Sequence, residues 1–136
     1  IRLAAEAELR AADFYTQLAQ NQTSEDVAQF FNNMAEEEKQ HAAKILSIGE
    51  KIFADGIPEK VESALLETEK IPQWAFTRQL SLQQALDLAW DAENRAAMVY
   101  QQWAEHSLMP KEVKVFFIAL ARAEEQHSQR LETLMP

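Results

Sequence analysis

Cysteine is absent from this chain of 136 residues, and glycine and proline are scarce. Without cysteine the chain has no disulfide framework, no thiolate metal site and no cysteine-ligated iron of its own. Only two glycines and four prolines interrupt a sequence dominated by alanine, leucine, glutamate and glutamine, which favours long helices over sheet. A chain of this length can bury a core without covalent cross-links, so we expect one all-α domain over residues 1–136.

Positive charge is also in short supply, with 13 basic against 22 acidic residues and a net charge of −9. This balance disfavours nucleic acid and anionic membrane surfaces as partners. No apolar run approaches the roughly 20 residues of a membrane helix, so we expect no membrane contact by this segment. The lack of cysteine fits a reducing compartment, and we expect a cytoplasmic protein. Because the chain begins at Ile1 rather than Met, a targeting peptide or further domains stay open.

Apolar residues recur at spacings of three and four over four stretches, which predicts four helices. The helices are expected over residues 1–20, from 24 to a point between Gly49 and Gly56, from 81 to a tight connection at 107–110, and from there to the end. Between the second and third lies a long connector, in which residues 60–70 can form a short helix. Two short turns and one long connector predict two antiparallel helical hairpins joined by one long crossover, which together make a four-helix bundle.

Local signals mark where three of these helices begin. Thr23 or Ser24 can cap the second helix. The third is preceded by Ser81-x-x-Gln84, the pattern of a capping box. Pro110 suits the first turn of the fourth helix, where its missing N–H costs nothing.

Two four-residue segments of the chain share the motif Glu-x-x-His: Glu38-Lys39-Gln40-His41 and Glu124-Glu125-Gln126-His127. Each is preceded in the chain by a second shared motif, in which a tyrosine lies seven residues after a glutamate: Glu8 to Tyr15 and Glu93 to Tyr100. Glu8 precedes Glu38 by 30 residues and Glu93 precedes Glu124 by 31. The nearly equal spacing predicts an internal repeat of one helical hairpin.

The duplication places a Glu or a Glu-x-x-His in the middle of every predicted helix, on its apolar face. A desolvated glutamate there costs several kcal/mol unless it is paired or binds a metal. A single such residue is most often a polar side chain that faces solvent and has no role in a site. Four glutamates and two histidines, however, cannot neutralise one another. Two divalent cations would match the four carboxylates, and residues at i and i+3 share a helix face, so each Glu-x-x-His can serve one centre. Oxygen ligands with two nitrogens suit iron or manganese, and zinc can also bind.

The segments FYTQLA, MAEEEKQHAAKI, AENRAAMVY and ARAEEQHSQRL resemble the rubrerythrin branch of the ferritin-like superfamily over nearly the whole chain. The resemblance implies a carboxylate-bridged site for two iron ions. Its implied ligands are Glu8, Glu38, His41, Glu93, Glu124 and His127, with Glu38 and Glu124 bridging the metals and Glu8 and Glu93 terminal. It also implies reduction of hydrogen peroxide, oxidation of ferrous iron by dioxygen or peroxide, or iron storage.

The chain departs from this family in two respects. Full rubrerythrins end in a rubredoxin domain with four cysteines, which this chain lacks, so electrons would come from an external donor or from the iron substrate. Peroxidase-type members carry an additional carboxylate about one turn beyond the third-helix ligand, where this chain has Ala96 and Ala97. The alanines weaken the assignment as a peroxidase and leave a more symmetric site with six ligands.

We therefore expect a di-iron oxidoreductase that oxidises ferrous iron with dioxygen or hydrogen peroxide, in iron homeostasis or oxidative-stress defence. The alternative is a non-catalytic metal-binding or iron-storage domain, which could be the soluble part of a longer protein. Tyr15 and Tyr100 lie two turns from their glutamates on the same face, where they could hydrogen-bond a ligand, donate an electron or simply pack. Aromatic residues beyond what one bundle hides predict a homodimer or larger homo-oligomer.

One difference between the halves suggests that the two metal positions are unequal. The residue before the glutamate of Glu-x-x-His is Glu37 in the first half and Ala123 in the second. A carboxylate there could accept a hydrogen bond from the ligand histidine of the opposite hairpin, His127, and strengthen its bond to the metal. The alternative is that Glu37 only faces solvent.

Overall fold

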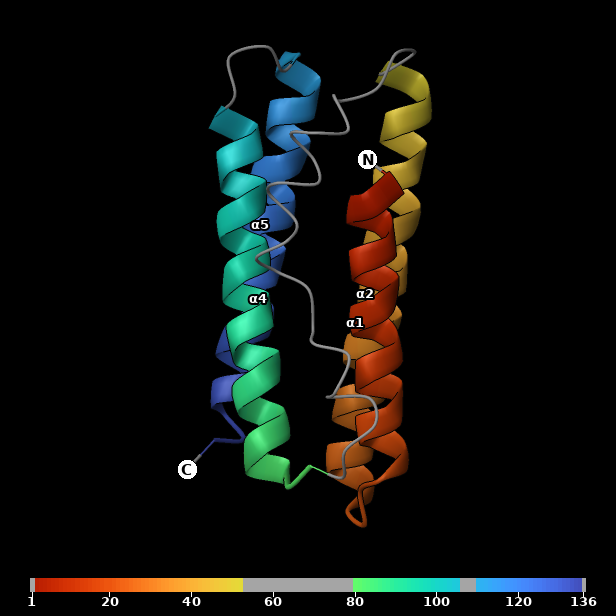
Figure 1. Cartoon of the computed structure of the whole chain (residues 1–136), viewed down its shortest axis with the longest axis vertical. Coiled ribbons are helices and arrows are strands. Elements are labelled where there is room, and N and C mark those ends of the chain that lie inside the picture. The colour runs from red at the N-terminus through yellow and green to blue at the C-terminus, as the bar shows by residue number, and fades with distance from the viewer. Residues whose placement is uncertain (1, 53–79, 106–109, 136) are drawn as a thin grey trace. The chain divides into compact units, whose positions relative to one another are not determined.

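A computed structural model describes residues 2–52, 80–105 and 110–135 of the chain. Within these ranges it contains four helices and no strand: α1 (Arg2–Gln20), α2 (Glu25–Ile52), α4 (Leu82–Glu105) and α5 (Lys111–Glu132) (Figure 1). The predicted all-α class is confirmed. The long crossover, with its short helix over 60–70, and most of the tight connection before Pro110 lie outside the described residues.

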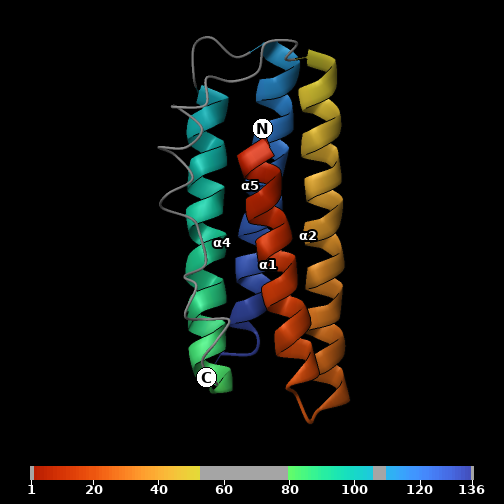
Figure 2. The ribbon, with the colours of Figure 1, turned by 45° about the vertical axis from the view of Figure 1, so that its right-hand side comes forward.

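Contacts along the chain define two compact units, one holding α1 and α2 and the other holding α4 and α5. In each unit the two helices run antiparallel and pack along their length, as the colour sequence in Figures 1 and 2 shows. The chain reverses between α1 and α2 within residues 21–24. Each unit is thus a helical hairpin, as the duplicated sequence predicted. None of the described helices is long and apolar enough to span a membrane.

The start of α2 is capped by Ser24 rather than Thr23. The backbone N–H of Val27 donates to Ser24 Oγ over 3.4 Å, and the N–H of Ala28 donates to the Ser24 carbonyl over 3.0 Å. Glu25 and Asp26 occupy the first turn, where their charge complements the positive end of the helix dipole.

The predicted capping box at the start of α4 is confirmed in both directions. Gln84 N–H donates to Ser81 Oγ over 3.1 Å, and Ser81 N–H donates to Gln84 Oε1 over 3.0 Å. At α5 the prediction is displaced by one residue. Pro110 is the cap residue, with φ −58° and ψ 150°, and its carbonyl accepts from Val113 and Lys114. Its extended ψ lies outside the helical region, so the first helical residue is Lys111.

Each hairpin buries the helix faces that the spacing predicted. The buried apolar residues predicted from that spacing are Phe31, Met34, Ile45, Ala85, Ala89, Tyr100, Trp103, Val113, Phe117, Leu120 and Leu131. Three residues predicted from the same spacing are less buried: Ile48 and Leu134 are half-buried, and Leu82 is 38% exposed at the first residue of α4. The same faces carry the six proposed ligands, so the apolar core of each hairpin fixes where these polar side chains lie.

Candidate metal centre

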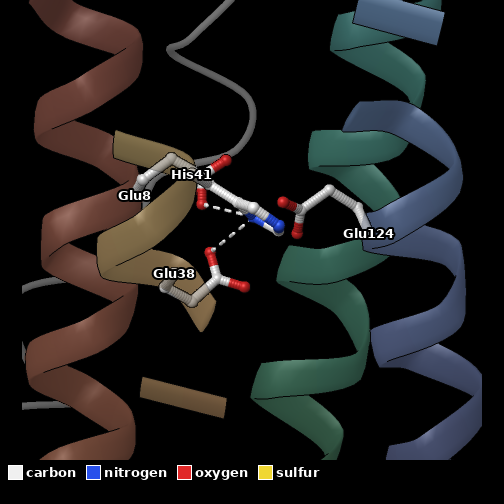
Figure 3. A group of neighbouring side chains, drawn as sticks. All are labelled: Glu8, Glu38, His41 and Glu124. Carbon is white, nitrogen blue, oxygen red and sulfur yellow. Dashed lines mark ion pairs between the residues drawn. The ribbon is translucent and has the colours of Figure 1, made fainter. Parts of the chain in front are cut away.

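The first hairpin brings three of the predicted ligands together. α1 supplies Glu8, and α2 supplies Glu38 and His41, which share a face because they are three residues apart. In Figure 3 the carboxylates of Glu8 and Glu38 point toward the His41 ring. His41 Nδ1 lies 3.8 Å from Glu8 Oε2 and 4.0 Å from Glu38 Oε2. One ligand atom from each of the three lies within 4.8 Å of the others.

The second hairpin repeats this arrangement. α4 supplies Glu93, while Glu124 and His127 come from α5. His127 Nδ1 lies 3.4 Å from Glu93 Oε1 and 3.9 Å from Glu124 Oε2, and the three ligand atoms again lie within 4.8 Å of one another. In both hairpins the ring nitrogen nearest the carboxylates is Nδ1. We refer to these two sets as the first triad (Glu8, Glu38, His41) and the second triad (Glu93, Glu124, His127).

The four distances suit atoms arranged around an ion better than direct hydrogen bonds. Nitrogen–oxygen separations of 3.4 to 4.0 Å are longer than the usual 2.7–3.2 Å of a hydrogen bond. Two donor atoms each about 2.1 Å from one ion, at a right or tetrahedral angle, are themselves about 3.0 to 3.4 Å apart. The observed separations lie at or slightly above that range. A small inward adjustment of the side chains would therefore complete a metal site in each triad.

Burial makes the donor set costly without cations. All six triad residues are buried, and His41 is the most exposed of them at 9%. Among the described residues no lysine or arginine is buried, and the buried basic side chains beside the four carboxylates are the two triad histidines. Burying a carboxylate is costly, whereas a divalent cation turns the same groups into ligands. The donor set thus fits a metal site of the kind predicted.

Sequence reasoning missed a seventh buried polar residue, Ser128, which follows His127 in α5. Its hydroxyl donates to the Glu125 carbonyl over 2.9 Å, three residues earlier in the same helix. Because this bond is local, Ser128 needs no ion or substrate to explain its burial.

Each predicted tyrosine packs next to a phenylalanine of the partner helix in its own hairpin. The Tyr15 and Phe31 rings are stacked with centroids 6.1 Å apart and an interplanar angle of 17°. The Tyr100 and Phe117 rings are stacked at 5.7 Å and 22°. Both tyrosines are buried, at 1% and 0% exposure. The internal repeat therefore extends two turns beyond the ligands into the packing.

The two alanines that follow Glu93 also lie in α4. Ala97 is buried and Ala96 is half-buried, one turn beyond Glu93. Neither side chain carries a ligand atom. Glu37 is half-buried as well. His106, the third histidine of the chain, lies outside the described residues.

A sequence model of the rubrerythrin family matches residues 1–135 of the chain. Comparison with curated proteins and with solved structures found no match to either. The four helices agree with the all-α four-helix bundle fold of this family, as the sequence predicted. The family implies iron binding, and the clustered glutamates and histidines fit a metal site.

Proposed function

Because the chain belongs to the rubrerythrin family, we propose that its two triads act together as one site for two iron ions and oxidise ferrous iron with dioxygen or hydrogen peroxide. The observation that carries this proposal is the duplication itself. Each hairpin holds a buried set of two carboxylates and one imidazole, with ligand atoms within 4.8 Å of one another. A protein that needed one structural ion would need only one such set.

Charge supports a pair of divalent ions. The two triads carry four carboxylates, so two divalent cations bring the site to neutrality. Neutral imidazoles complete the ligand set without adding charge. Hard carboxylate oxygens combined with imidazole nitrogen favour iron or manganese, and zinc can be accommodated. Iron would supply the one-electron chemistry that dioxygen or peroxide reduction requires.

The protein side chains have separate roles in this proposal. Glu8 and Glu38 of the first triad, and Glu93 and Glu124 of the second, would supply the carboxylate ligands. A carboxylate can bind through one oxygen or two, so these groups can follow a change in metal charge without moving the helices. The histidines would each add a nitrogen ligand, and Nδ1 is the atom that lies nearest the carboxylates; the surrounding apolar core limits the access of water to the buried side chains. The two stacked tyrosines pack two turns away from the terminal carboxylates.

The two alanines of α4 lead us to expect different rates for the two candidate reactions. Because Ala96 and Ala97 offer no further carboxylate, we expect oxidation of ferrous iron to be faster than peroxide reduction coupled to an external electron donor. Stopped-flow mixing of the ferrous protein with dioxygen, and separately with hydrogen peroxide, measures the first reaction. Peroxide consumption with a small electron-transfer protein measures the second. Rapid multiple turnover in the second assay would reverse the ranking.

The same experiment separates catalysis from passive iron binding or storage. Ferrous protein that binds its metal but develops no ferric absorption faster than free ferrous iron would be a binding domain. His127→Ala serves as a variant with an incomplete second triad, and Glu6→Gln is a matched control because Glu6 is exposed on α1. We expect His127→Ala to lose rapid oxidation and Glu6→Gln to retain it.

A further inference from the structure

The second hairpin contains a cluster of three buried aromatic rings, formed by Tyr100, Trp103 and Phe117. The Trp103 ring meets Tyr100 at a centroid distance of 6.0 Å and an angle of 73°, and meets Phe117 at 5.1 Å and 88°. Tyr100 stacks on Phe117 at 5.7 Å. All three side chains are at most 1% exposed. We refer to these residues as the aromatic triad.

The first hairpin lacks this arrangement, although it keeps the tyrosine–phenylalanine pair. Tyr15 and Tyr100 are 85 residues apart, and so are Leu18 and Trp103. Leu18 therefore occupies the position of Trp103, and it is buried as well. An aliphatic side chain is enough to fill this part of a hairpin core. Packing alone therefore does not require an indole at position 103.

The indole lies along the helix that carries a metal ligand. Tyr100 is seven residues beyond Glu93, which is about 10 Å along α4, and Trp103 follows by roughly another 4.5 Å. The Tyr100 ring contacts Trp103 and lies between it and the level of the second triad along this helix. Electron transfer weakens steeply with distance, so an aromatic ring in contact with a donor provides a better route than aliphatic packing.

The environment of the indole nitrogen favours transfer of an electron without a proton. Trp103 Nε1 is buried, and within the part of the chain that the structure describes no group accepts its hydrogen bond. A buried N–H without an acceptor has nowhere to lose its proton. Oxidation of this ring would therefore leave the indole as a radical cation that keeps its proton.

We propose that Trp103 is a one-electron donor to the metal site, with the Tyr100 ring as the bridge. This inference rests on the proposed function, which supplies the oxidant as dioxygen or hydrogen peroxide reacting with bound iron. One electron leaves the indole, crosses the Tyr100 ring and reduces the oxidised iron, so the total oxidation state of the iron falls by one. Trp103 is left as a radical cation, and no bond forms or breaks. A further ferrous ion, the substrate of the proposed reaction, returns the electron and becomes ferric.

The donor step would let the site finish reducing dioxygen or hydrogen peroxide when only one ferrous ion is left to supply electrons. It would also give the second hairpin a role that the first hairpin lacks. Tyr100 and Trp103 are positioning and electron-transfer residues in this scheme, since neither needs to bind the metal.

The first test is spectroscopic. A variant that keeps Trp103 as its single tryptophan (Trp74→Phe with Trp90→Phe), grown with ring-deuterated tryptophan, is loaded with ferrous iron, mixed with hydrogen peroxide and frozen. Electron paramagnetic resonance should show an indole radical whose hyperfine pattern changes with deuteration. Trp103→Phe should lose the signal. Tyr100→Phe, which keeps the ring, should retain it, whereas Tyr100→Leu should lose it with helix content unchanged.

Iron oxidation is followed optically in the same samples, so the two proposals can fail separately. Ferric iron without an indole signal in the single-tryptophan protein would overturn the donor role and leave the proposed function standing. Loss of the signal in Tyr100→Phe would show that the tyrosine hydroxyl, not the ring alone, carries the charge, and would overturn the bridge.

A metal-free experiment decides the donor role if iron is not oxidised. Because the chain has no cysteine, Gln101→Cys on the exposed side of α4 gives one attachment point for a photo-oxidant. In the single-tryptophan variant excitation should form the protonated indole radical at Trp103, and the additional change Trp103→Phe should abolish it. A deprotonated indole radical, or a radical that survives Trp103→Phe, would contradict the proposed electron donor.

Discussion

The two hairpins of this protein agree closely at the predicted metal ligands and differ in what surrounds them. In the first, the histidine Nδ1 lies 3.8 and 4.0 Å from its two carboxylates, and in the second 3.4 and 3.9 Å. The tyrosine–phenylalanine stacks agree equally well, at 6.1 and 5.7 Å. The repeat is therefore kept where donor atoms must converge and where a ring fixes the helix pair beside them.

The differences lie just outside that common framework. Trp103 replaces Leu18, and Ala123 replaces Glu37. The ligand histidine is 9% exposed in the first hairpin and 1% exposed in the second. The two hairpins carry the same predicted ligands but different neighbouring side chains. They can therefore bind the same metal and still differ in function. Experiments that treat the halves separately can reveal which of these differences matters.

The largest expected effect is stabilisation of both hairpins by metal. A ligand at 100 times its dissociation constant contributes about 2.7 kcal/mol per site. For a chain of this size each kcal/mol raises the unfolding temperature by about 3 to 5 °C. We expect zinc to raise the unfolding temperature of wild type by both contributions, and that of His41→Ala or His127→Ala by about one. Calorimetry with and without zinc measures this, and an unshifted wild-type transition would refute a metal site in either hairpin.

A smaller effect of the opposite sign is expected without metal. Each buried carboxylate then lies near the other carboxylate of its triad. Glu8→Gln and Glu93→Gln should each stabilise the metal-free protein by about 1 kcal/mol, because an amide removes the buried charge. Both variants should lose the stabilisation by zinc. Urea unfolding measures the change, and Glu6→Gln should stay within about 0.5 kcal/mol of wild type. Destabilisation of both metal-free variants would mean that the charges are already compensated.

An effect confined to one metal position is expected from Glu37, which has a counterpart without a carboxylate in the second hairpin. A carboxylate hydrogen-bonded to a metal-bound histidine strengthens the ligand, and losing it costs roughly 10-fold in affinity or more. Glu37 is half-buried beside Glu38, whereas Ala123 occupies the equivalent place beside Glu124. We expect Glu37→Ala to weaken one cobalt position and leave the other unchanged. Titration followed by the visible absorption of cobalt would detect this, and Glu36→Ala is the exposed control. Identical titrations of wild type and Glu37→Ala would exclude the support.

Much of this arrangement could be predicted from the sequence because its determinants are local or periodic. The capping box at Ser81 involves groups three residues apart, and the spacing from Glu38 to His41 fixes a shared helix face. The repeated motifs predicted that α1 pairs with α2 and that α4 pairs with α5, as the helix contacts show. The assignment of the six residues as ligands is still a prediction, supported by the geometry of each triad.

The features that the sequence did not predict depend on three-dimensional context. Thr23 and Ser24 are both good caps, and only the backbone path selects Ser24. Leu82 fits the apolar spacing of α4, but at the first residue of the helix its side chain stays 38% exposed. Trp103 was identified as a core residue, yet periodicity could not show that its ring meets two others or that its N–H has no acceptor among the described residues.

The most direct test of the central proposal is the number of iron ions that each chain binds. Protein loaded anaerobically with ferrous iron, freed of excess metal and analysed by elemental analysis should approach two equivalents, one for each hairpin. His41→Ala and His127→Ala should each approach one equivalent. A wild-type value of one that His127→Ala leaves unchanged would contradict the proposal that the two triads together hold two ions.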